Sequence, residues 1–120
     1  MGAEKPHHKL EAWKEAISLV TAVYDATSHF PTHELYGLTS QIRRSVVSIP
    51  SNVAEGAGRS GTREFAKFLS ISRGSLSELE TQLLIAVQLG YLPDDHAIFT
   101  LLERVSRLMT GLHRKMSGLT

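Results

Sequence analysis

The sequence predicts an all-α protein folded as an antiparallel up-down-up-down four-helix bundle. Apolar residues recur at steps of three and four in four separate stretches, which places them along one side of a helix in each case. Short connectors containing Gly, Pro and Asp separate the stretches, and short connections favour antiparallel neighbours. No stretch competes as a strand, because the β-prone residues 45–49 run directly into Pro50 and find no partner.

The composition indicates one globular domain. A chain of 120 residues with 42% hydrophobic and 21% charged residues is large enough for one core. Residues 1–8 are expected to be a disordered tail and residues 9–117 a single bundle. The absence of cysteine excludes disulfides and thiolate chemistry. No apolar run resembles a signal peptide or a membrane span, so we expect a cytoplasmic protein with no membrane partner.

The first two helices are predicted on either side of the Phe30–Pro31 pair. The first begins near Lys9, with an expected core stripe of Leu10, Trp13, Ile17, Val20, Tyr24 and Thr27. The second covers residues 38–57, with its stripe at Leu38, Ile42, Val46, Ile49 and Val53. Pro50 lies inside the second helix and costs about 3 kcal/mol there. Because the stripe continues in phase through Pro50, we expect a kink at this residue and not a break.

The third and fourth helices are predicted over residues 62–89 and from Asp94 or Asp95 to about Gly118, with Gly90 as a C-terminal cap between them. The third helix is apolar on more than one side, since residues outside its core stripe include Phe68, Ile71, Leu84, Ile85, Val87 and Leu89. A bundle interior needs only one stripe from each helix. The surplus therefore predicts contact with another copy of the chain.

A polar stripe runs beside the apolar one on the second helix and includes Arg44, Asn52 and Glu55. If the second and third helices pack antiparallel about a turn near residue 60, Arg44 would lie near Glu80 and Glu55 near Arg73. These residues could form a catalytic acid–base set or a structural network of ion pairs. No nucleophile or histidine joins them, so we favour the structural network and predict that the protein is not an enzyme.

A basic cluster is predicted around the glycine turn at residues 56–61. Its members are Arg43, Arg59, Arg63 and Lys67. Lysine and arginine neutralise backbone phosphates whatever the base sequence, so this cluster is a candidate nucleic-acid contact, with Arg104 and Arg107 as further candidates. The alternative is a solvated face, because few aromatic residues are interleaved for base stacking.

Neither a cofactor nor a metal ion is predicted. Residues 56–61 match the pattern G-x-G-x-x-G, but a dinucleotide site also needs a strand before the glycines and a βαβ unit around them. An interhelix turn is the better interpretation. His29 and His33 are four positions apart, but Pro31 between them removes the helical geometry that a metal site at this spacing requires.

Several runs resemble the four-helix-bundle proteins encoded in intervening sequences of 23S ribosomal RNA. The runs are residues 10–13 (LEAW) with Ala16, 30–31, 36–44, 48–56 (SIPSNVAEG) and 74–83 (GSLSELETQL). The resemblance implies a left-handed bundle assembled as a homopentamer, with no established enzymatic activity. An accessory protein of diversity-generating retroelements also looks similar; it is a basic pentamer that binds nucleic acid and a reverse transcriptase. The net charge of +1 departs from that basic relative.

Together, the residues and the resemblance predict a non-enzymatic, oligomeric binding or scaffolding module with weak, non-specific RNA or DNA binding. The alternative is a protein–protein adaptor that has no nucleic-acid role. The expected partners are further copies of the chain, RNA or DNA, and possible protein ligands.

Overall fold

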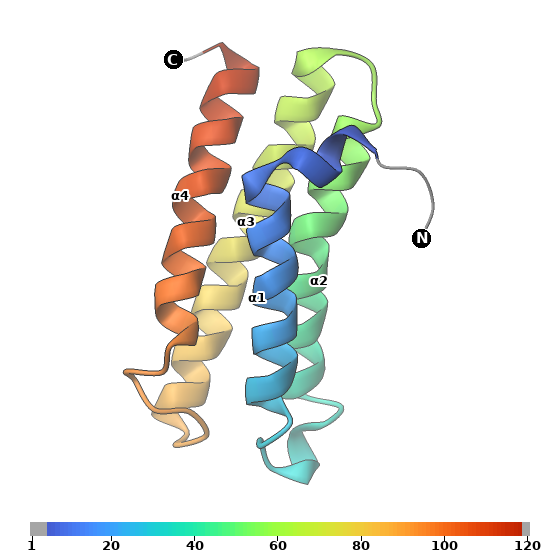
Figure 1. The fold of residues 1–120 in the computed structure, drawn as a ribbon. Coiled ribbons are helices and arrows are strands. Elements are labelled where there is room, and N and C mark those ends of the chain that lie inside the picture. The colour runs from blue at the N-terminus through green and yellow to red at the C-terminus, as the bar shows by residue number, and fades with distance from the viewer. Residues whose placement is uncertain (1–4, 119–120) are drawn as a thin grey trace.

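The computed structural model describes residues 5–118 and forms an all-α structure with four long helices (Figure 1). The elements are the 3-10 helix η1 (Pro6–Lys9), α1 (Glu11–Thr27), the 3-10 helix η2 (Thr32–Glu34), α2 (Leu38–Ala57), α3 (Gly61–Gln88) and α4 (Ile98–Ser117). No strand occurs among the described residues. The predicted four-helix all-α fold is confirmed, and successive long helices run in opposite directions in Figure 1.

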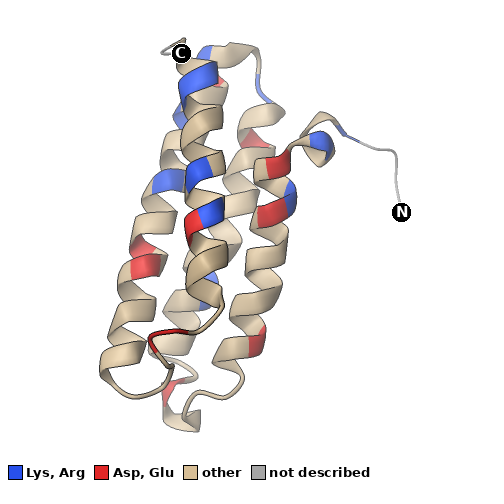
Figure 2. Cartoon of the chain, turned by 60° about the vertical axis from the view of Figure 1, so that its left-hand side comes forward, with Lys and Arg blue, Asp and Glu red and all other residues tan. Residues whose placement is uncertain are grey.

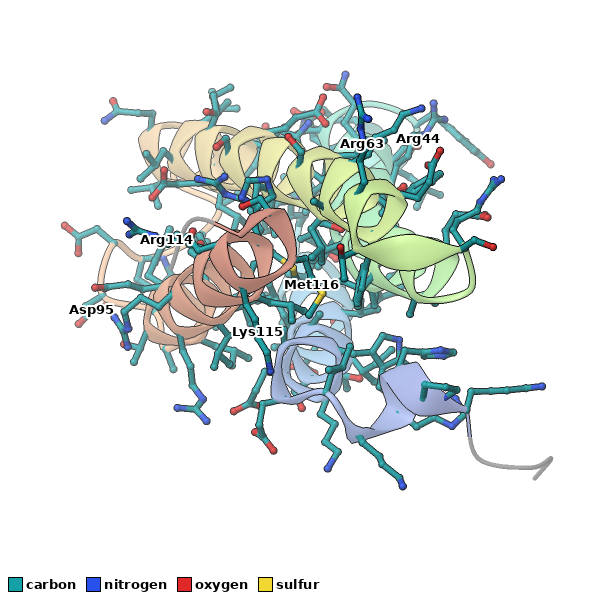
Figure 3. All side chains as sticks on the ribbon, turned by 90° about the horizontal axis from the view of Figure 1, so that it is seen from above. Arg44, Arg63, Asp95, Arg114, Lys115 and Met116 are labelled. Atoms are coloured by element: carbon teal, nitrogen blue, oxygen red, sulfur yellow. The ribbon has the colours of Figure 1, made fainter. Side chains whose placement is uncertain are left out.

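Each long helix packs against two others, in the cyclic order α1, α2, α3, α4. The largest side chains with no exposed surface come from all four helices: Leu19, Ile42, Ile49, Leu69, Leu79, Leu83, Ile98 and Met109. Met116 points toward the interior at one end of the bundle, where it packs against this core (Figure 3). The core is therefore a single apolar column between the helices.

In the core stripe predicted for the second helix, four of the five residues are buried and Leu38 is half-buried, but the stripe predicted for the first helix was wrong at two positions. Ile17 and Tyr24 are 41% and 42% exposed. The side of α1 that faces the core carries Ala12, Ala16, Leu19, Val23 and Ala26. The prediction followed the large residues, whereas three small alanines face the core and leave Ile17 and Tyr24 outside.

The predicted tail covers residues 1–8, of which 1–4 lie outside the described residues. Lys5 precedes η1, and the η1 residues His7 and His8 pack on Trp13 of α1 with ring centroids 5.2 and 5.0 Å away. The prediction of a tail was therefore wrong for residues 6–8, because these aromatic contacts hold the segment against the bundle.

Helix α2 continues through Pro50 without a break, and Pro50 itself is buried. The degree of bending at Pro50 stays a prediction. Two hydroxyl groups bond to α2 carbonyls just before the proline: the Ser51 hydroxyl of α2 donates to Val47 O at 2.8 Å, and the Ser72 hydroxyl of α3 donates to Ile49 O at 2.9 Å. The Ser72 bond ties α2 to α3 next to the proline, which interrupts the regular helix ladder.

Candidate nucleic-acid interface

A polar network joins α2 and α3, but its main contacts involve residues other than those predicted. The Ser45 hydroxyl donates to Glu78 Oε1 at 3.2 Å, and the hydroxyls of Ser48 and Ser75 lie 2.6 Å apart. Asn52, a predicted member, donates from Nδ2 to Ser48 O at 2.8 Å. Short hydroxyl side chains therefore connect the two helices across their contact.

The predicted pairings of Arg44 with Glu80 and of Glu55 with Arg73 were wrong, since neither is an ion pair among residues 5–118. Glu55 instead pairs with Arg59, with Oε2 and Nη2 3.0 Å apart. Arg73 and Glu80 line a pocket together with α4 residues. Glu78 and Glu80 differ by two positions, which is about 200° around a helix, and Glu78 is the one on the α2 side.

Two of the predicted nucleic-acid contacts are engaged within the chain. Arg43 donates from Nε to the Thr27 hydroxyl at 2.9 Å and stacks on the Tyr24 ring at 4.5 Å. It lies 16 positions before Arg59, about 24 Å along the helix, so the prediction that it belongs to the cluster at the glycine turn was wrong. Arg59 pairs with Glu55.

The two further candidates on α4 are also paired with carboxylates. Arg104 bonds to Glu15 of α1, and this hydrogen bond raises the pKa of the Arg104 guanidinium. Arg107 pairs with Glu103, with Nη1 and Oε1 3.0 Å apart. Their positive charge is therefore partly offset by a nearby carboxylate in each case.

Arg63 and Lys67 lie differently, on a shallow groove between α3 and α4. This α3–α4 groove consists of two pockets that share Ser70 and is lined by Arg63, Lys67, Ser70, Arg73, Gly74, Ser77, Glu80, Ser106, Thr110 and His113, among others. No carboxylate forms an ion pair with Arg63, Lys67 or Arg73 within the described chain. The structure thus brings unpaired cations and hydroxyl groups together on one surface, which also carries the carboxylates of Glu64 and Glu80.

Arg73 and His113 connect the two walls of the groove. Arg73 Nη1 lies 3.2 Å from His113 Nδ1 across α3 and α4. Because an arginine can only donate, His113 Nδ1 accepts in this arrangement. Arg114 lies beside the groove on the outer surface of α4 and points away from the bundle in Figure 3.

The charges of α3 and α4 are distributed unevenly along the bundle. Figure 2 shows basic segments in the upper parts of both helices, which are the N-terminal part of α3 and the C-terminal part of α4. Acidic segments lie further down. A positive surface with hydroxyl donors and little steric bulk at Gly74 is suited to a phosphate backbone. The sequence reasoning missed His113 and Arg114; the signal was their position on the polar side of the predicted fourth helix.

Other kinds of site find little support in the described chain. No group of three or more His, Asp or Glu side chains between residues 5 and 118 is arranged to hold a metal ion. None of the described helices combines the length and the apolarity that crossing a bilayer requires.

Comparison with known proteins gives one family. The family model described as 23S rRNA-intervening sequence protein matches residues 8–112. No curated protein matches the chain.

Proposed function

The chain belongs to the 23S rRNA-intervening sequence protein family, and from this membership and its exposed cations we propose a non-enzymatic, oligomeric binding module that contacts RNA or DNA. The contact is the α3–α4 groove. Binding is electrostatic and independent of base sequence, because the groove offers guanidinium, ammonium and hydroxyl groups but no Phe, Tyr or Trp ring for base stacking.

The observation that carries this proposal is the contrast between paired and unpaired cations. Arg59, Arg104 and Arg107 each have a carboxylate partner, whereas Arg63, Lys67 and Arg73 have none among residues 5–118. An unpaired cation gains more from a phosphate than one that must first leave a carboxylate. The α3–α4 groove, which gathers three such cations, is therefore a favourable surface for a polyanion.

Self-association forms the second half of the proposal. Apolar side chains on α3 remain exposed in the single chain: Ile71, Leu84, Ile85 and Leu89 are 44–53% exposed. Covering such residues with another copy is favourable, and the family resemblance favours a homopentamer. In a ring, the groove is repeated on every subunit, so that a long nucleic acid binds several weak sites at once. We place this assembly in the cytoplasm; the likeness to the retroelement accessory protein stays a prediction.

The proposal is tested by neutralising two unpaired cations. Lys67→Gln/Arg73→Gln removes two charges from the groove, and the matched variant Arg59→Gln/Arg107→Gln removes two charges that are already paired. Each is titrated with a generic single-stranded RNA at low and near-physiological salt, by fluorescence anisotropy. We expect the groove variant to bind at least ~10-fold more weakly with a shallower salt dependence, since fewer counterions are released, and the control to stay within ~3-fold of the wild type.

Equal losses in the two variants would show that net charge matters and the groove does not. Absence of binding by the wild type at low salt would favour the second candidate, a protein–protein adaptor. The observation that favours an adaptor is Tyr36, which is 94% exposed beside the exposed Leu35. An exposed aromatic residue of this kind is typical of protein contacts.

A further inference from the structure

A second groove, between α2 and α3, contains a buried polar atom that the described chain leaves without a hydrogen-bond partner. This α2–α3 groove has a volume of about 580 Å3 and is lined by Gln41, Arg44, Ser45, Ser48, Asn52, Ile71, Ser75, Glu78 and Gln82. Gln82 is 7% exposed, and its Oε1 has no hydrogen-bond partner within the described chain. A buried oxygen without a partner costs about 1–3 kcal/mol, and a donor supplied by another chain would offset that cost.

The groove and the adjoining surface of α3 at Ile85 combine a charge with apolar edges. Glu78 is exposed and accepts from Ser45, but it forms no ion pair among residues 5–118. Ile71, toward one end of α3, is 45% exposed, and Ile85, toward the other end, is 44% exposed. From end to end, the surface therefore presents an apolar residue, an anion and a second apolar residue.

A neighbouring surface of the molecule presents the complementary order. This α1–α2 face consists of Ile17, Tyr24, Tyr36, Arg43 and Val47, and all but the half-buried Arg43 are at least 40% exposed. Arg43 forms no ion pair among residues 5–118. The order along the bundle is Ile17, then the cation Arg43, then Tyr36.

The heights of these residues agree between the two surfaces. Helices α1 and α2 are antiparallel, and the contact of Arg43 with Thr27 fixes their register. A residue of α1 is level with the residue of α2 whose number brings the sum to 70, so Ile17 is level with position 53. For α2 and α3, the contacts of Ser45 with Glu78 and of Ser48 with Ser75 show that the numbers of two level residues add to 123. Ile71 and Glu78 are then level with positions 52 and 45.

Three matched levels follow from these registers. Ile17 and Ile71 differ by about 1.5 Å in height, and Arg43 and Glu78 by about 3 Å, at 1.5 Å for each helical residue. Ile85 is level with position 38, close to Tyr36. A rotation about an axis parallel to the bundle leaves heights unchanged, so each residue of one surface would meet its counterpart on a rotated copy.

We propose that the α2–α3 groove of one subunit binds the α1–α2 face of the next copy, with Ile17 on Ile71, Arg43 on Glu78 and Tyr36 on Ile85. This inference rests on the proposed self-association and adds the contact that produces it. The two surfaces lie on adjacent sides of the bundle, one between α1 and α2 and the other between α2 and α3 (Figure 1). They are different surfaces, although α2 contributes to both. A contact between two different surfaces is heterologous and forms a ring when its rotation closes.

The absence of cysteine from the chain makes a direct test possible. In Ile17→Cys/Ile71→Cys, the two thiols cannot join within a subunit because α1 and α3 make no contact across the bundle, and a disulfide needs Cα atoms within about 7 Å. Oxidation should therefore link neighbouring subunits into a ladder that ends at the ring size. In the control Ile17→Cys/Ser70→Cys, the second thiol lies at nearly the same height but lines the α3–α4 groove, and no ladder should form.

A charge exchange gives an independent measurement. Arg43→Glu and Glu78→Arg should each raise the dissociation midpoint of the oligomer at least 10-fold in light scattering, whereas the double variant should recover most of the loss. Glu80→Arg, on the α3–α4 groove, should change nothing. If the wild type is oligomeric but Ile17→Cys/Ile71→Cys gives no ladder and Glu78→Arg has no effect, this contact is overturned and self-association stands. A wild-type monomer of 13.2 kDa would overturn both.

Discussion

Glu34 accepts hydrogen bonds from two distant parts of the chain at the end of the bundle where α2 begins. Its Oε1 accepts from the Leu38 backbone N–H at 3.1 Å, and its Oε2 accepts from the Tyr91 hydroxyl at 2.9 Å. The bond from Leu38 has the largest effect in lowering the pKa of the Glu34 carboxyl, and the bond from Tyr91 lowers it further. The bond to Glu34 also raises the pKa of the Tyr91 hydroxyl. The ionised carboxylate thus starts α2 and holds the turn between α3 and α4.

These bonds predict a specific pH dependence. Because the folded pKa of Glu34 is lowered from 4.5, its contribution is present above that pH and is lost as the pH falls through the folded value. In Glu34→Gln the side chain has a similar size but no carboxyl group that can titrate. The free energy of unfolding of this variant should therefore fall less than that of the wild type between about pH 5 and 3. Urea unfolding at several pH values measures this, with Glu80→Gln, which has no such bonds, as the control; superimposable wild-type and Glu34→Gln profiles would contradict the role.

The sequence could not reveal this residue. Glu34 lies in the connector η2, outside any apolar period, and its hydroxyl partner Tyr91 is 57 positions away. The candidate cations show the same limit, since the sequence gives the charge of Arg59 and Arg63 but not which of them has a carboxylate partner. Such pairing depends on the rotation of each helix, which a charge pattern does not determine.

At the scale of the helix pair, Gly56 sets how closely α2 approaches α3. A Cβ added at Gly56 would lie 2.8 Å from Phe68 Cβ and 2.9 Å from Phe65 Cδ1. Gly56→Ala should therefore destabilise the fold by about 1–3 kcal/mol through overpacking. In contrast, a Cβ at the exposed Gly111 of α4 meets no other atom within 4 Å, and Gly111→Ala should stabilise by up to about 1 kcal/mol because alanine favours helix. Thermal unfolding of both variants would decide this, and equal shifts would exclude close packing at Gly56.

Helix existence and bounds were predictable because each depends on local sequence. The predicted range 38–57 is that of α2, and the prediction for the third helix differs from Gly61–Gln88 by one residue at each end. Which side of a helix faces which neighbour was less predictable. The prediction placed Glu80 at the contact with α2, where the structure has Glu78. It also placed Ile17 in the core, where the structure has Ala16. Periodicity defines a stripe, but shape and crossing geometry decide its orientation.

At the scale of the whole molecule, the two grooves lie on different sides of α3, so one can bind another subunit while the other stays open. The α2–α3 groove includes Ile71 and Glu78, and the α3–α4 groove includes Arg73 and Ser77. Assembly through the first would leave the second exposed on every subunit. A binding site that is weak in a single chain is thereby repeated around the ring, and the total affinity for a long polyanion rises without any new contact.

This arrangement predicts an effect that opposes simple electrostatics. Glu78→Arg adds positive charge, which by itself should strengthen binding to RNA. If the ring provides the affinity, the same substitution should weaken binding to a long RNA by ~10-fold or more, because it dissociates the subunits and removes the multivalent gain of about 10²–10⁴. A short RNA that reaches only one groove should be bound as well as before or slightly better. Anisotropy titrations of the wild type and Glu78→Arg with both RNAs separate the two effects, and tighter binding of the long RNA by the variant would show that each subunit binds alone.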